Sequence, residues 1–334
     1  MDNKALVPPG LTYLADNIKL KGNILGASKG EGSKWAKDLK LPKEADTVFF
    51  AGCGYQYGSK LESLMGLAKR MDKSALGSER AMGIASFQRK LGIDAAGVFL
   101  KVTSKGGDDA GPLVDAIKVL RKLGEEPGYL AEDEPCCGGM LHYMGLQKDF
   151  AGHARGVNEK LKSRGIKKII SIVPSCTYTL RKLMADVNGG SAFEVKHFCE
   201  VVADKVDSLH LHFPREVKVT YHDPCQLARY LGLIEEPRKI LRAIKDIEFV
   251  EPKWTKGEYA TCCGGGGGFE AVFPEMSEML AVNRARELIE TGAQIIVTNC
   301  PGCILQLETG LKALKADKIE VLDLAQVVAM SMEV

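Results

Sequence analysis

Cysteine spacing constrains this chain more than any other feature of its sequence. In the second half, Cys225 is followed by the adjacent pair Cys262-Cys263 and then, after an equally long spacer, by Cys300-Pro301-Gly302-Cys303. Adjacent cysteines are poor disulfide partners, because neighbouring Cα atoms across a trans peptide lie closer together than a relaxed disulfide prefers. Thiolates at such spacing suit zinc or an iron–sulfur cluster. The spacing therefore predicts that five thiols converge on one metal site.

The number of thiols favours iron–sulfur over zinc. Structural zinc takes four ligands, usually from two short chelating loops, whereas this set has five cysteines and two long spacers. Cys262-Cys263 also runs into Gly264–Gly268, and glycine lets the backbone approach a cluster and direct N–H groups at its sulfide. A flexible linker and buried apolar thiols are the alternatives, but they do not explain why both features coincide. We therefore expect Gly264 and Gly265 to lie against a cluster.

The first half repeats the pattern. Cys53 is followed by a longer spacer, then by Cys136-Cys137 and finally by Cys176. The glycines Gly138 and Gly139 come directly after the cysteine pair, as in the second half. Two copies of one pattern make coincidence a poor explanation. We expect a second cluster on Cys53, Cys136, Cys137 and Cys176, approached by these two glycines.

The first copy is one thiol short. Aligning Pro174-Ser175-Cys176 with Pro301-Gly302-Cys303 puts Val173 opposite Cys300. Aligning Cys176 with Cys300 instead puts Thr179 opposite Cys303, but loses the shared proline. Both alignments leave the first set with four cysteines.

Three segments carry a resemblance to a known family. Tyr221-His222-Asp223-Pro224-Cys225, Cys262-Cys263-Gly264 and Cys300-Pro301-Gly302-Cys303 resemble the cysteine-rich CCG domain of heterodisulfide reductase. The same domain occurs in iron–sulfur subunits of related lactate, glycolate and glycerol-phosphate oxidising systems. The resemblance extends over nearly the whole chain, since the opening from Gly22 to Cys53 also reads like the start of the first such domain.

The resemblance implies an oxidoreductase subunit that works within a complex. Five cysteines of this motif hold a noncubane 4Fe-4S cluster in the catalytic heterodisulfide reductase subunit, where a disulfide is cleaved. The implied catalytic cluster here is on Cys225, Cys262, Cys263, Cys300 and Cys303, with His222 as a further candidate. The four thiols of the first set imply an ordinary cubane 4Fe-4S cluster. Val173 in place of a ligand strengthens an alternative, an electron-transfer subunit between a dehydrogenase or flavin subunit and quinone. A zinc-stabilised scaffold without a redox role is the alternative from another class.

Other cofactors are expected on partner subunits. The sequence has no ferredoxin-type C-x2-C-x2-C-x3-C-P run and no GxGxxG in a strand-turn-helix setting. We therefore expect a ferredoxin-like 4Fe-4S subunit and a flavin-containing subunit as partners.

Composition gives no support to several other classes of protein. A formal net charge of +2 gives no support to nucleic-acid binding. No stretch approaches the ~20 apolar residues of a membrane span. The chain has ten cysteines, and its N-terminus shows no signal-peptide core. Together these features predict reduced, metal-bound thiols in the cytoplasm. Peripheral membrane association through partners stays open.

Alternating strand and helix patterns predict an α/β fold with two Rossmann-like parallel-sheet domains, related by an internal repeat. Strands are expected at 47–50, 98–102, 169–173, 217–221, 247–250, 295–297 and 319–322. Helices are expected at 11–21, around Trp35, and at 61–71, 112–123, 150–164, 237–244 and 274–290. The predicted domains are a helical lead-in over 1–45, a first CCG domain over 46–212 with an insertion at about 58–107, and a second over 213–334. In open parallel sheets ligands gather at the carboxyl ends of strands, where four of the cysteine segments lie.

Five residues near these segments are further candidates. His222 and Asp223 can hydrogen-bond cluster sulfur or relay a proton, or form a satisfied Asp-Pro turn with a buried histidine. Arg229 can offset cluster charge or form a surface ion pair. Cys199 is interpreted as a packing residue, and His142 reaches the first cluster only if its loop turns back.

Overall fold

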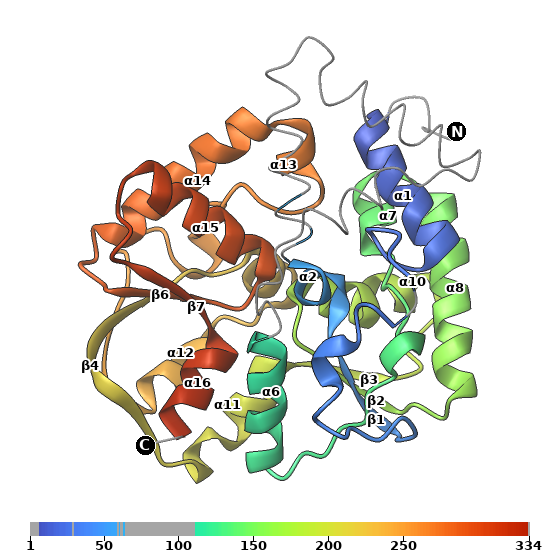
Figure 1. Cartoon of the computed structure of the whole chain (residues 1–334), viewed down its shortest axis with the longest axis horizontal. Helices are drawn as coiled ribbons and strands as arrows, with labels where there is room; N and C mark the ends of the chain where they lie inside the picture. The colour runs from blue at the N-terminus through green and yellow to red at the C-terminus, as the bar shows by residue number, and fades with distance from the viewer. Residues whose placement is uncertain (1–6, 29, 59, 61–62, 64–110, 333–334) are drawn as a thin grey trace.

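Two parallel sheets organise the chain in the computed structural model, which describes residues 7–28, 30–58, 60, 63 and 111–332 (Figure 1). The first sheet has the order β1-β2-β3, from strands β1 (Thr47–Phe50), β2 (Lys168–Ser171) and β3 (Glu194–His197). All of its strand pairs are parallel, and Val48 also bridges in parallel to Gly128. Val48, Phe49 and Phe50 are fully buried, as expected for a strand covered on both faces.

The second sheet has the order β5-β4-β6-β7 and is also parallel throughout. Its strands are β4 (Leu211–Tyr221), β5 (Ile244–Val250), β6 (Ile295–Thr298) and β7 (Glu320–Asp323). All of β6 is buried. The two Rossmann-like α/β units predicted from the sequence are therefore confirmed.

Helices cover the sheets and fill the space between them (Figure 1). Where the two sheets meet, α6 packs on α16 and α11, and α11 packs on α12. The α-helices are α1 (Pro9–Lys21), α2 (Gly52–Gln56), α6 (Gly111–Lys122), α7 (Gly139–Tyr143), α8 (Gln147–Ser163), α9 (Pro174–Tyr178), α10 (Met184–Asn188), α11 (Phe198–Lys205), α12 (Glu235–Arg242), α13 (Phe269–Val272), α14 (Pro274–Ile289), α15 (Pro301–Ala313) and α16 (Leu324–Met332).

Shorter helical turns lie between these elements. They are the 3-10 turns η2 (Lys34–Ala36), η3 (Ala131–Asp133), η5 (Val206–Ser208) and η7 (Gly257–Tyr259), and the π-helical turns η4 (Thr179–Leu183) and η6 (Gln226–Tyr230). Each π-helical turn begins shortly after a predicted ligand, Cys176 or Cys225. Such turns are frequent at functional sites. Within the described ranges, no helix has both the length and the apolar character that crossing a membrane requires.

Most predicted elements are confirmed with small boundary shifts, but some expectations were wrong. Strand β4 begins at Leu211 rather than at the predicted Val217, and it shifts register between His212 and Val217. The helix expected to end at Ile244 ends at Arg242, and Ile244 begins β5. Strand β3 was not predicted. The expected helix at 61–71, strand at 98–102 and nearly all of the insertion at 58–107 lie outside the described residues. The domain limit at 212/213 stays a prediction, and β4 runs across it.

Candidate metal centre

The second cysteine set lies where two neighbouring strands end. β4 ends at Tyr221, shortly before Cys225, and β6 ends at Thr298. Cys300 is the N-cap residue of α15, and Cys303 lies in the first turn of that helix. Because β4 and β6 pair in parallel, their carboxyl ends meet at one edge of the sheet. The fold therefore brings together segments that are far apart in the sequence.

The five thiols of this set interact with one another. The sulfurs of Cys263 and Cys303 lie 3.2 Å apart. Hydrogen bonding with Cys262, and then with Cys303, holds the pKa of Cys263 well below its usual value. Cys263, and then Cys300, raise the pKa of Cys303. Burial raises the pKa of Cys225 to about 11, with contributions from Cys300 and Cys263. A proton or a metal bound at one thiol therefore affects the others.

The first cysteine set forms a matching group. The sulfurs of Cys137 and Cys176 lie 3.4 Å apart. The pKa of Cys136 is raised well above its usual value, first by Cys137 and then by Cys53. Cys53 and Cys176 follow the paired strands β1 and β2, so this group also lies at the carboxyl edge of its sheet. All four thiols predicted for the first site are neighbours.

These contacts decide between the two alignments of the copies. Cys176 contacts Cys137 as Cys303 contacts Cys263, so Cys176 corresponds to Cys303. Val173 is the N-cap residue of α9 as Cys300 is of α15. Val173 therefore occupies the position of the fifth thiol, and the first set lacks that thiol.

Backbone amides of both glycine segments point at sulfur. Gly138 N–H donates to Cys136 Sγ at 3.4 Å, and Gly264 N–H donates to Cys262 Sγ at 3.3 Å. Gly264 has a positive φ, and a Cβ there would lie 2.3 Å from the carbonyl oxygen of Ser277. A side chain is excluded at Gly139 and Gly265 too, by Thr179 and Gln306 respectively. Glycine is thus required at these positions by the surrounding protein, which leaves the amides directed at the thiols.

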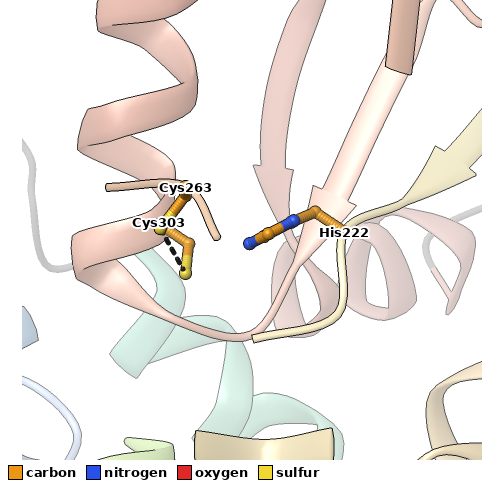
Figure 2. A group of neighbouring side chains, drawn as sticks. All are labelled: His222, Cys263 and Cys303. Carbon is orange, nitrogen blue, oxygen red and sulfur yellow. Dashed lines mark hydrogen bonds between the residues drawn. The ribbon is translucent and has the colours of Figure 1, made fainter. Parts of the chain in front are cut away.

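His222 completes the second set. Its side chain is buried, and its ring nitrogen and the sulfurs of Cys263 and Cys303 all lie within 4.8 Å of one another. Figure 2 shows the ring pointing at the two sulfurs. Asp223 has a different role, since it accepts two hydrogen bonds from Arg238, at 2.8 and 2.9 Å, and one from Gly257 N–H at 2.8 Å. Of the two residues, only His222 lies among the thiols.

The donors fit an iron–sulfur cluster. Two groups of soft thiol ligands converge, and amide N–H groups are directed at their sulfurs. Buried His222 Nε2 has no hydrogen-bond partner among the described residues, although it faces the second group. An anionic sulfur-rich group would accept hydrogen bonds from both the amide N–H groups and this ring nitrogen.

Comparison with known proteins gives the family. Residues 107–181 and 219–308 match the CCG family, described as a cysteine-rich domain. The two matched segments contain Cys136, Cys137 and Cys176 in the first copy and all five cysteines of the second set. This is a CCG-domain protein.

Curated relatives of the CCG-domain protein include redox enzymes. It is 35% identical over 224 residues to a subunit of the dihydromethanophenazine:CoB–CoM heterodisulfide reductase of Methanosarcina acetivorans, covering 64% of this chain and 54% of the relative. It is 34% identical over 227 residues to the EtfAB:quinone oxidoreductase of Syntrophomonas wolfei, covering 65% of this chain and 31% of the relative. The chain therefore spans about half the length of the first relative and about a third of the second.

One solved structure shares the fold of the CCG-domain protein. A hypothetical protein from Helicobacter pylori aligns over 67% of this chain and 46% of its own, with a TM-score of 0.50 and 16% sequence identity. At that identity the match concerns the fold alone.

The remaining candidate residues make contacts outside the two sets of thiols. Arg229 donates to the carbonyls of Glu258 and Ala260, and its charge lowers the pKa of the Cys225 thiol less than burial and the neighbouring thiols raise it. Cys199 is fully buried, 3.1 Å from His197 Nδ1, in agreement with a packing role. The ring of His142 packs edge-on against Phe150 on α8.

Two residues that no sequence pattern indicated lie beside the cysteines. The half-buried carboxylate of Glu134 accepts hydrogen bonds from the N–H groups of Ala51 and Gly52, each 2.9 Å long, and thereby fixes the backbone directly before Cys53. Burial raises the pKa of Glu134 to about 8. His153, rather than His142, contacts the first set, with Nε2 2.8 Å from the carbonyl oxygen of Cys136. No motif in the sequence signals either contact, because each joins separate segments.

A cavity of about 600 Å³ opens beside the first set. Cys53 and Cys136 form part of its wall, together with Gln56, Glu134 and His153. Its mixed polar lining contrasts with the apolar walls usual for small-molecule sites.

Proposed function

We propose that this CCG-domain protein is an iron–sulfur redox subunit that cleaves or forms a disulfide, or a related sulfur bond, at its second cysteine set. The observation that carries the proposal is a difference in exposure between the sets. Cys262 is exposed and Cys225 and Cys300 are half-buried, whereas all four cysteines of the first set are buried. A substrate can therefore approach the second set directly.

The fifth thiol supports the same assignment. A cubane 4Fe-4S cluster needs four cysteines, so the second set can hold its iron and still present a position to a substrate's sulfur. The proposed cofactors are a noncubane 4Fe-4S cluster on the second set and a cubane cluster on the first; when bound, they supply one-electron transfer. In this proposal Asp223, held by Arg238, anchors the turn that presents Cys225.

Electron relay toward quinone is the second candidate. Val173 at the fifth-thiol position of the first set favours it, because the first site then resembles an ordinary electron-transfer centre. Similarity to an EtfAB:quinone oxidoreductase supports it as well. In either case we propose a ferredoxin-like and a flavin-containing subunit as partners and a cytoplasmic location, with membrane contact through partners.

Two measurements test the proposal. Anaerobically purified protein should contain about eight iron and eight sulfide per chain, for two 4Fe-4S clusters. Near-stoichiometric zinc with little iron would contradict the redox role. The reduced protein should then be reoxidised by a small disulfide faster than by a short-chain quinone; the reverse order would favour electron relay.

A further inference from the structure

Arg284 lies directly behind His222 and is completely buried in α14. Its Nε donates a 3.0 Å hydrogen bond to His222 Nδ1. Its Nη1 donates to the carbonyl oxygen of Thr255 and to Glu287 Oε2, both at 2.8 Å. The guanidinium is therefore held on one side by Glu287 and Thr255 and presents Nε to the imidazole on the other.

This contact determines which nitrogen of His222 carries the proton. A guanidinium has donors only and stays charged, so the ring atom that faces it must accept. Neutral histidine with Nδ1 as acceptor carries its proton on Nε2, and Nε2 faces the sulfurs of Cys263 and Cys303 (Figure 2). Metal-ligating histidines show the opposite arrangement, in which the second ring nitrogen donates to a carboxylate, carbonyl or water. The arrangement suits a donor to sulfur and opposes ligation by Nε2.

We infer that His222 is a hydrogen-bond donor to the sulfur of the second cluster rather than an iron ligand, and that Arg284 is the positioning residue that fixes it in this role. The inference rests on the proposed cluster at the second set. Reduction adds negative charge to the cluster, so a donor to its sulfur stabilises the reduced form more than the oxidised form. His222 and Arg284 should therefore raise the reduction potential of this cluster.

The first half provides an internal comparison. Phe50 precedes Cys53 by three residues, as His222 precedes Cys225, and Phe50 is buried. Phenylalanine cannot donate to sulfur. The rise in reduction potential should therefore be confined to the cluster of the second set.

The test is a redox titration of the full chain, monitored by electron paramagnetic resonance under anaerobic conditions. His222→Phe should lower the reduced-to-oxidised ratio of one cluster about tenfold at a fixed potential, a shift of ~59 mV for a one-electron couple. His222→Gln, whose amide also donates, should recover part of the shift. The other cluster should titrate as in the unmodified protein. An unchanged potential in His222→Phe would overturn the inference.

A double-mutant cycle tests the part played by Arg284. Arg284→Lys keeps the positive charge but removes the planar Nε–H donor, so it should lower the potential of the same cluster. In the His222→Phe background it should have little further effect, because Arg284 acts through His222. Fully additive shifts would overturn this positioning role. Arg286→Lys, at an exposed site on the same helix, is the control.

Nitrogen spectroscopy separates a donor from a ligand. In protein labelled with 15N-histidine, pulsed electron paramagnetic resonance should show only a weakly coupled nitrogen, and His222→Phe should keep the full iron content. A strongly coupled nitrogen, or loss of iron in His222→Phe, would make His222 a ligand and overturn the inference. Absence of iron–sulfur signals in the unmodified protein would instead contradict the proposed function, so the two failures are distinguishable.

Discussion

Tyr55 and Asp323 join the two halves of the chain through a fully buried hydrogen bond, in which the Tyr55 hydroxyl donates to Asp323 Oδ2. Tyr55 lies two residues after Cys53, and Asp323 ends β7 of the second sheet. Next to this contact, a Cβ at Gly54 would lie 2.5 Å from Pro301 Cγ. Helix α2, which carries Cys53, therefore packs directly against α15, the helix that carries Cys303. The two sites are neighbours, as Figure 1 shows from the position of α2 between the halves.

Asp323 should make stability depend on pH. Burial raises the pKa of Asp323 from 3.8 to about 6. The folded protein then binds this proton more tightly than the unfolded chain, so the free energy of unfolding falls as pH rises from about 4 to about 6, by up to about 3 kcal/mol. Asp323→Asn should remove this part of the pH dependence, measured by thermal unfolding across that range. Asp317→Asn, at an exposed site, should keep it. If the free energy of unfolding fell equally with pH in Asp323→Asn and in the unmodified protein, groups other than Asp323 would cause the pH dependence.

Cys300 and Val173 should respond differently to substitution, because they occupy equivalent N-cap positions and only one is a thiol. Cys300→Ala should change the spectrum of one cluster and abolish turnover. Val173→Ala and Thr179→Ala should each leave both clusters in place, as judged by iron content and absorbance.

Cys136→Ala tests whether the first set binds a cluster at all. Losing one of four thiols should remove about half of the iron, since a cubane has no spare ligand. An unchanged iron content would mean that Cys53, Cys136, Cys137 and Cys176 do not hold a cluster together.

Gly264 should not tolerate a side chain. Gly264→Ala introduces a Cβ 2.3 Å from the carbonyl oxygen of Ser277, at a residue with a positive φ. The left-handed backbone alone should cost about 1 kcal/mol of stability, and the clash should add to this and reduce cluster loading. Gly152→Ala, in the middle of α8 with open space around its Cβ position, is the control. It should leave stability unchanged or raise it by up to about 1 kcal/mol. Similar unfolding midpoints for the two variants would contradict the packing described at Gly264.

The isolated chain should not accept electrons from NADH. The sequence has no nicotinamide or flavin fingerprint, and one-electron clusters cannot take a hydride. The measurement is anaerobic bleaching of the brown iron–sulfur absorbance by NADH, with and without a ferredoxin-like or flavin-containing partner subunit. Rapid bleaching by NADH alone would reveal a hydride-accepting site in this chain.

The sequence by itself determined the composition of the two cysteine groups. Most cysteine segments follow a strand of buried β-branched or aromatic residues, such as β1 and β6, and the ends of parallel strands meet at one edge of a sheet. Local pattern and one rule of topology were therefore enough to group Cys225 with Cys300, although the two are distant in the chain. The same local patterns located most of the helices.

Tertiary structure decided what local pattern does not encode. It matched Cys176 to Cys303 through sulfur contacts, and it extended β4 back to Leu211 because Leu211 and His212 pair with Ile244 and Lys245 of β5. It also placed Arg284 behind His222, 62 positions away in the chain. A hydrogen bond between distant side chains depends on how a helix packs on a sheet edge, and that packing leaves no periodicity in either segment. The sequence thus determined which thiols gather. Only the tertiary structure decided that His222 faces the second set with its protonated nitrogen, Nε2.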